Sequence, residues 1–147
     1  MTAFNRRVLE EFVEDEYATL LLLVLDPATG AVSWSSAGHP PPLLTGPTPR
    51  SLAFAGSLPV GLFGDATYRT AHFTLAPGRC VVLYTDGVVE ARNPDGQQFG
   101  TEGLEAASPA VSASAAAVAE VVLKQVLSHS GGHLDDDAAV LVLRREP

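Results

Sequence analysis

The sequence is poor in cysteine, in basic residues and in long apolar stretches. Its single cysteine, Cys80, cannot form a disulfide within the chain, which argues against a disulfide-stapled secreted scaffold and favours a reducing compartment. Nine Lys and Arg residues are scattered among 147 positions, so the basic clusters that bind nucleic acid are missing. The longest apolar run, Leu20 to Leu25, has the length of a strand and falls far short of the roughly 20 residues of a membrane span.

These absences favour a soluble, acidic cytoplasmic protein with no membrane and no nucleic-acid partner. The formal net charge is −8, and 46% of the residues are hydrophobic, which is enough to bury a substantial core. The charged, amphipathic start of the chain, Met1 to Val13, is unlike a signal peptide. Because no stretch within residues 1–147 is long enough to be an interdomain linker, we expect a single domain.

Hydrophobic periodicity predicts a mixed architecture. Helices are predicted within residues 1–13 and over residues 114–128, and strands over residues 17–25, 32–35, 68–75, 80–85 and 138–144. The unbroken leucine run in the first strand predicts burial on both faces, whereas residues 32–35 alternate and should be half exposed. Ser114 is a plausible N-cap. The order of a helix, antiparallel strands, a helix and a final strand indicates an α+β fold.

The stretch from Cys80 to Glu90 leads an apolar strand into a carboxylate. Asp86 follows Thr85 at the end of the strand, and Gly87 allows the chain to turn where a side chain would clash. A second acidic set, residues 135–137, stands just before the last strand. If the two strands are antiparallel neighbours, both sets of acids meet at one sheet edge. Mg²⁺ and Mn²⁺ bind oxygen ligands of this kind.

Two interpretations of these acids stay open on the residues alone. Asp86 can simply start a turn, and Asp135, Asp136 and Asp137 can form a solvated loop. Alternatively, a bound cation relieves the mutual repulsion of three adjacent carboxylates. His39, in a Gly-His-Pro-Pro-Pro segment, fits a loop histidine that hydrogen-bonds backbone better than it fits a catalytic or ligand imidazole.

The remaining reactive side chains give weaker signals. His133 lies near the acid run and fits either an exposed loop residue or a proton donor. His72 and His129 are expected at the surface, and Cys80 is expected to pack in the core. The sequence matches neither the phosphate-binding nor the dinucleotide-binding glycine patterns.

Four segments together resemble one family, the bacterial PPM-type Ser/Thr phosphatases of the sporulation-stage-II-E-like class. They are Leu25 to Gly30, Ala37 to Leu44, Leu83 to Asn93 and Asp135 to Asp137. The segments follow the order and spacing of the family, and the resemblance covers essentially residues 4–145. It implies a β-sandwich of two mostly antiparallel sheets flanked by helices, with a two-metal Mn²⁺ or Mg²⁺ centre at one edge.

The resemblance also implies an activity and roles for particular residues. Such proteins hydrolyse phosphoserine or phosphothreonine, and many act on phosphorylated anti-sigma-factor antagonists. Asp86 resembles the metal-binding Asp of the family's Thr-Asp-Gly motif, and Asp136 resembles the ligand of its terminal acidic motif. Gly87, Asp137, Asp135 and His39 are secondary candidates. No catalytic residue is implied beyond the metal centre.

One family motif is missing from this sequence. The family carries an N-terminal Asp-Val-x-Gly-(His/Lys)-Gly segment whose Asp bridges both metals, and residues 1–147 contain no such segment. The chain is therefore expected to be the C-terminal portion of a phosphatase domain, an incomplete sandwich with part of its metal site absent. Uncovered apolar strands favour pairing, so a homodimer through the open sheet is a further expectation.

Two functions remain open at this point. The first is metal-dependent Ser/Thr phosphoprotein phosphatase activity, with Asp86 and Asp136 as metal ligands. The alternative is a catalytically incompetent, phosphatase-like module that binds a regulatory protein. The missing motif favours the alternative for this chain alone. The retained acids favour the first for the protein from which the chain derives. A purely structural α+β domain is a third possibility, which the set of motifs disfavours.

Overall fold

The computed structural model describes residues 1–11, 16–52, 57–108 and 114–146. It confirms the predicted α+β class, with two antiparallel sheets and helices. The chain forms two compact units, one built from Met1–Pro41 with Ala53–Thr74 and the other from Pro42–Leu52 with Leu75–Pro147. We call them the first and the second unit and describe each by itself.

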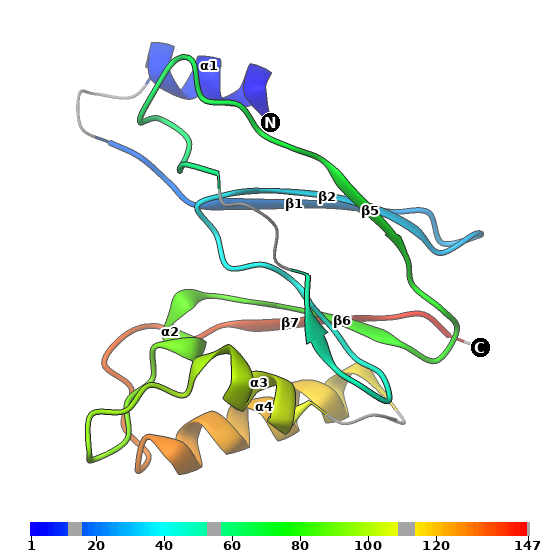
Figure 1. Ribbon diagram of the computed structural model, residues 1–147, viewed down its shortest axis with the longest axis vertical. Helices are drawn as coiled ribbons and strands as arrows, with labels where there is room; N and C mark the ends of the chain where they lie inside the picture. Colours follow the sequence, from blue (N-terminus) through cyan, green and yellow to red (C-terminus); the bar gives the residue numbers. More distant parts are fainter. Residues whose placement is uncertain (12–15, 53–56, 109–113, 147) are drawn as a thin grey trace. The chain divides into compact units, whose positions relative to one another are not determined.

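The first unit contains a helix and a three-stranded antiparallel sheet (Figure 1). Its elements are α1 (Thr2–Glu11), β1 (Leu20–Leu25), β2 (Ala31–Ala37) and β5 (Ala71–Thr74), and the strand order is β1-β2-β5. Strands β1 and β2 form an antiparallel hairpin and pair from Leu20↔Ala37 to Leu25↔Val32. Helix α1 is anchored by buried Asn5, whose amide donates to the Phe63 carbonyl at 2.9 Å and whose Oδ1 accepts from the Gly61 N–H at 2.9 Å.

Burial in this sheet differs from the prediction at two strands. Strand β1 is not buried on both faces, since Leu22 is 48% exposed and Val24 is 60% exposed. The two exposed residues are two positions apart and therefore share one face of the strand, which is open to solvent, while the residue between them is half-buried. Strand β2 is more buried than its alternating sequence suggests, and even Ser35 and Ser36 are inaccessible. It lies between β1 and β5, so both of its edges are covered.

The second unit holds a four-stranded antiparallel sheet and three helices. Its strands are β3 (Leu43–Leu44), β4 (Arg50–Ser51), β6 (Cys80–Tyr84) and β7 (Val140–Arg144), in the order β4-β3-β6-β7. Its helices are α2 (Asp86–Val89), α3 (Gly100–Ala107) and α4 (Ala115–His129). A tight turn precedes β6, in which the Arg79 N–H donates to the Ala76 carbonyl at 3.1 Å.

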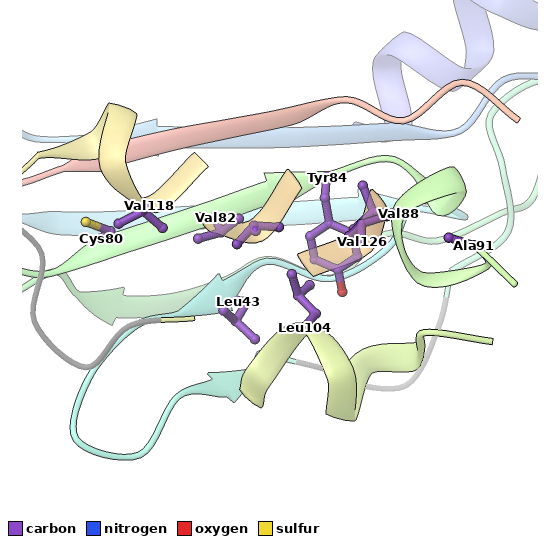
Figure 2. Packing of buried hydrophobic residues seen from close by; sticks show 10 residues of the cluster. Leu43, Cys80, Val82, Tyr84, Val88, Ala91, Leu104, Val118 and Val126 are labelled. Atoms are coloured by element: carbon purple, nitrogen blue, oxygen red, sulfur yellow. The ribbon is translucent and has the colours of Figure 1, made fainter. Parts of the chain in front are cut away.

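The core of the second unit lies between its sheet and the helices α3 and α4 (Figure 2). Alternate residues of β6 point into it, and α4 contributes three valines at a spacing of four, which repeat on one helix face. Within this cluster the residues with at most 1% exposure are Leu43, Cys80, Val82, Val88, Leu104, Val118, Val122 and Val126. The predicted core role of Cys80 is confirmed, and burial raises the pKa of its thiol.

Two helices of this unit differ from the prediction and one agrees with it. Helix α4 begins as predicted, because Ser114 Oγ accepts from the Ala117 N–H at 3.1 Å. Helix α3 was not predicted. The expected Thr-Asp-Gly turn is instead the start of the one-turn helix α2. Among the described residues, no helix combines the length and the apolar character needed to cross a bilayer.

Candidate functional site

The two acidic segments meet at one end of the β6–β7 ladder. The strands pair antiparallel from Cys80↔Arg144 to Tyr84↔Val140, so β6 ends where β7 begins. Thr85 therefore lies beside Ala139. Helix α2, which follows β6, begins next to the segment that leads into β7 (Figure 1). The prediction that antiparallel neighbours bring these acids to a common edge is confirmed.

Thr85 joins the two segments directly. Its N–H donates to the Ala139 carbonyl at 3.1 Å, and its hydroxyl accepts from the Ala139 N–H at 2.9 Å. The hydroxyl also donates to the Asp137 carbonyl at 3.1 Å. The Thr85 carbonyl accepts from the Val88 N–H at 3.1 Å, which starts α2. A single residue thus connects the strand end, the short helix and the acidic segment.

Gly87 is required by a close backbone approach. A Cβ atom placed on Gly87 would lie 2.4 Å from the Asp137 carbonyl oxygen and 2.9 Å from its carbonyl carbon. The prediction that a side chain would clash here is confirmed, although the residue lies in a helix and not in a turn. The group that it would meet is the backbone of the acidic segment.

The carboxylates of this edge are exposed to solvent. Asp86 Oδ1 accepts from the Gly87 N–H at 3.1 Å, and Asp136 Oδ1 accepts from the Asp137 N–H at 2.7 Å. Each of these two side chains is thereby held by one oxygen against the backbone. Residues 134–138 line an open pocket of about 510 Å³ next to them.

Neutralising charge is scarce at this edge. In the described part of the chain, one of these acids has a basic partner: His133 Nε2 lies 3.7 Å from Asp135 Oδ1. Both side chains are mostly exposed. Neighbouring carboxylates repel one another, and a bound divalent cation would relieve that repulsion. Their oxygens are also hard ligands of the kind that Mg²⁺ and Mn²⁺ prefer.

The described residues fit part of a metal centre. Asp86 and Asp136 offer carboxylate oxygens from two adjoining segments, as the chemistry of Mn²⁺ or Mg²⁺ requires. Across residues 1–11, 16–52, 57–108 and 114–146, however, no three His, Cys, Asp or Glu side chains gather closely enough to hold a metal by themselves. Within the described residues the ligand set is therefore incomplete.

Of the four histidines, His133 contacts an acid of this edge, and the others have contacts of their own in the described part of the chain. His39 lies in the first unit, where its Nδ1 is 3.1 Å from the Pro40 carbonyl, the contact expected of a loop histidine. His72 is exposed as predicted. The prediction of a surface position for His129 is wrong, because its ring is half-buried, packs edge-on against Phe99 and contacts the Gln97 carbonyl at 2.9 Å.

A solved structure with the same arrangement of sheets and helices defines the class of fold. The phosphatase domain of SpoIIE from Bacillus subtilis, presoaked with Mn, superposes with a TM-score of 0.75. The match covers 99% of this chain and 64% of that one, at 18% identity. The fold is therefore that of a bacterial PP2C-type phosphatase domain.

The family follows from the sequence itself. Residues 1–146 match the Stage II sporulation protein E (SpoIIE) family, and the chain belongs to that family. Protein IcfG of Synechocystis is 26% identical over 131 residues, which is 88% of this chain. The phosphoserine phosphatase RsbP of Bacillus subtilis is 30% identical over 95 residues, or 61% of this chain. The chain spans 21% of IcfG and 24% of RsbP.

Two features of the edge could not be found from the sequence. Thr85 and Gly87 were visible as parts of a motif, but the hydroxyl bridge and the close approach join positions about fifty residues apart. No local pattern signals such contacts. The acidic residues themselves carried a signal, because each group borders an apolar strand.

Proposed function

We propose that this chain provides part of the divalent-metal centre of a phosphoprotein phosphatase that hydrolyses phosphoserine or phosphothreonine. Asp86 and Asp136 are its metal ligands, and Mn²⁺ or Mg²⁺ is the cofactor. The observation that carries the proposal is the convergence of the two acidic segments at the end of the β6–β7 ladder. Membership of the SpoIIE family supports it.

In this proposal the four aspartates at the end of the β6–β7 ladder have different roles. Asp86 is presented by the first turn of α2, and Asp136 by the segment that leads into β7. Asp135 and Asp137 add negative charge that attracts the cation, with Asp137 also anchoring the segment through its carbonyl. When bound, a divalent cation supplies an activated water and neutralises phosphate oxygens. The exposure of the acids suits a substrate as large as a protein.

The proposed substrate is a small phosphorylated regulatory protein of the anti-sigma-factor-antagonist type. RsbP, which shares 30% identity over 95 residues, is itself a phosphoserine phosphatase. The four segments that carry the family resemblance include both acidic motifs. A phosphoserine peptide is therefore the substrate class to test once a generic substrate has shown turnover.

A second candidate function has one observation in its favour. Within the described residues no group of three metal-binding side chains is assembled. A module that binds a regulatory protein without hydrolysing anything needs no such group. The two functions differ in whether Mn²⁺ produces turnover, so one experiment separates them.

The experiment measures hydrolysis of an aryl phosphate by the purified chain, with and without Mn²⁺. We expect metal-dependent turnover that Asp86→Asn abolishes, because the substitution removes a ligand charge. Asp95→Asn is the matched control, since it removes the same charge from an exposed turn of the same unit. Absence of turnover, with Mn²⁺ leaving the melting temperature unchanged, would favour the binding module.

The metal assignment has its own readout, independent of turnover. A ligand that binds only the folded chain raises its melting temperature. We expect Mn²⁺ to raise the melting temperature of the wild-type chain and of Asp95→Asn, but not that of Asp86→Asn. A full Mn²⁺ shift in Asp86→Asn would show that Asp86 is not a ligand.

A further inference from the structure

Thr85 occupies the N-cap position of α2 but does not cap the helix with its side chain. Its backbone angles, φ −83° and ψ 162°, are those of an N-cap residue. A threonine there ordinarily accepts a hydrogen bond from a backbone N–H of the first helical turn. Here no such bond is made by the hydroxyl, and Asp86 Oδ1 accepts from the Gly87 N–H instead. The Thr85 hydroxyl is therefore available for another purpose.

The Thr85 hydroxyl extends the β6–β7 ladder beyond its last residue pair. After the last pair, Tyr84↔Val140, the Thr85 N–H still donates to the Ala139 carbonyl. The Thr85 carbonyl accepts from the Val88 N–H of α2 and not from the Ala139 N–H, because the chain has already turned into the helix. The hydroxyl oxygen takes the place of that carbonyl and accepts from Ala139 at 2.9 Å. The chain can thus enter a helix at once while the opposite segment stays attached.

The same hydroxyl also holds the acidic segment two residues before Ala139, at Asp137. Its proton goes to the Asp137 carbonyl at 3.1 Å, so its donor and one acceptor position are both in use. Asp137 adjoins Asp136, and Thr85 adjoins Asp86. Both proposed ligands are consequently one residue away from a group bonded through this hydroxyl.

We propose that Thr85 is a positioning residue that sets the separation of Asp86 and Asp136 for cation binding. The inference rests on the proposed function, because it gives the hydroxyl bridge a purpose only if these two acids share a metal centre. Outer groups that orient metal ligands typically change metal affinity by about 10- to 100-fold when removed. A purely structural hydroxyl would change stability and leave the affinity of the folded chain as it was.

The second unit contains a matched control for that distinction. Thr45 is buried, and its hydroxyl accepts from the Cys80 N–H at 2.9 Å. Thr45 thus accepts a backbone hydrogen bond at the start of β6, as Thr85 does at the end of β6 near the acids. Thr45→Val and Thr85→Val each replace a hydroxyl by a methyl group of nearly equal size. Each substitution leaves one backbone N–H without its hydrogen-bond acceptor.

The experiment is a Mn²⁺ titration that follows free Mn²⁺ by electron paramagnetic resonance, using folded protein at a temperature well below its melting transition. We expect Thr85→Val to weaken Mn²⁺ binding about tenfold or more, and Thr85→Ser, which keeps the hydroxyl, to restore most of the affinity. Thr45→Val should melt at a lower temperature than wild type and bind Mn²⁺ with unchanged affinity.

A measurement on the wild-type chain covers the case in which Thr85→Val does not fold. Mn²⁺ that binds both acidic segments should slow hydrogen exchange at the Ala139 amide, whose acceptor is the Thr85 hydroxyl. The Ala117 amide, which Ser114 caps at the start of α4, serves as the reference and should not respond.

The outcomes separate this inference from the proposed function. If Asp86→Asn abolishes Mn²⁺ binding while Thr85→Val binds as tightly as wild type, the metal centre stands and the positioning role is wrong. Unchanged Ala139 exchange on Mn²⁺ binding would count against the role in the same way. If the wild-type chain binds no Mn²⁺, or Asp86→Asn binds it fully, both ideas fail.

Discussion

The close approach of Gly87 to the acidic segment makes Gly87→Ala a sharp test of the site geometry. The added methyl carbon would lie 2.4 Å from the Asp137 carbonyl oxygen, and this distance must open by about 1 Å to reach the ordinary contact range that begins at 3.4 Å. The obstacle is backbone on both sides, and no flexible side chain can move aside. The Thr85 bonds to Asp137 and Ala139 resist the same displacement.

Two opposing terms set the size of the effect. Overpacking costs about 1–3 kcal/mol, and a contact as short as 2.4 Å against backbone belongs in the upper part of that range, at about 2–3 kcal/mol. Alanine is favoured over glycine within a helix by about 1 kcal/mol, which offsets part of that cost. The free energy of unfolding should therefore fall by roughly 1–2 kcal/mol in Gly87→Ala. For a chain of this length, that corresponds to a melting temperature lower by roughly 2–8 °C.

Thermal unfolding followed by far-ultraviolet circular dichroism is the assay, because α3 and α4 of the second unit dominate the helical signal. Gly46→Ala is the control, since its new carbon would meet only the flexible end of Arg79, at 3.4 Å. We expect the control to stay within about 0.5 kcal/mol of wild type. A Gly87→Ala variant that melts at or above the wild-type temperature would refute the close approach.

Three further predictions concern other parts of the chain. Ser114→Ala should lower the free energy of unfolding by about 1 kcal/mol, because the Ala117 N–H loses its cap, and denaturant unfolding measures this. Burial raises the pKa of Tyr84 from its ordinary 10.0 to about 12, so the unfolded chain loses this proton first and stability should fall as pH rises from about 10. Tyr84→Phe should remove that part of the pH dependence. Exposed Leu22 and Val24 on the edge strand β1 favour pairing with a second copy. Light scattering should therefore give a dimer mass that Leu22→Lys reduces to one chain.

Strong local signals predicted the frame of the site. Strands β6 and β7 follow from apolar runs bounded by turns. Their antiparallel pairing was the condition on which the common acidic edge depended, and the structure supplies it. Helix α4 follows from its cap and its valine spacing. These signals act over a few residues, so a single sequence is enough to locate them.

The missed elements are those stabilised by contacts distant in sequence. Helix α3 has eight residues, two of them glycines, and a single fully buried anchor, Leu104, so its periodicity is too weak to stand out. Helix α2 has only four residues. The burial of β1 was overestimated because a leucine run reveals apolar character and not the number of neighbours. His129 was misplaced for the same reason, since its partners Gln97 and Phe99 lie some thirty residues away.

The span between Thr85 and Asp137 also has a consequence for how the protein folds. Their contact closes a stretch 52 residues long, whose closure alone costs roughly 3–4 kcal/mol of chain entropy. Helix α4 lies within that stretch and can form from local contacts much earlier. The two acidic segments therefore come together only when the long-range ladder closes. Cation capture at this edge would mark the completion of folding, and a rapid-mixing experiment should see it lag behind helix formation.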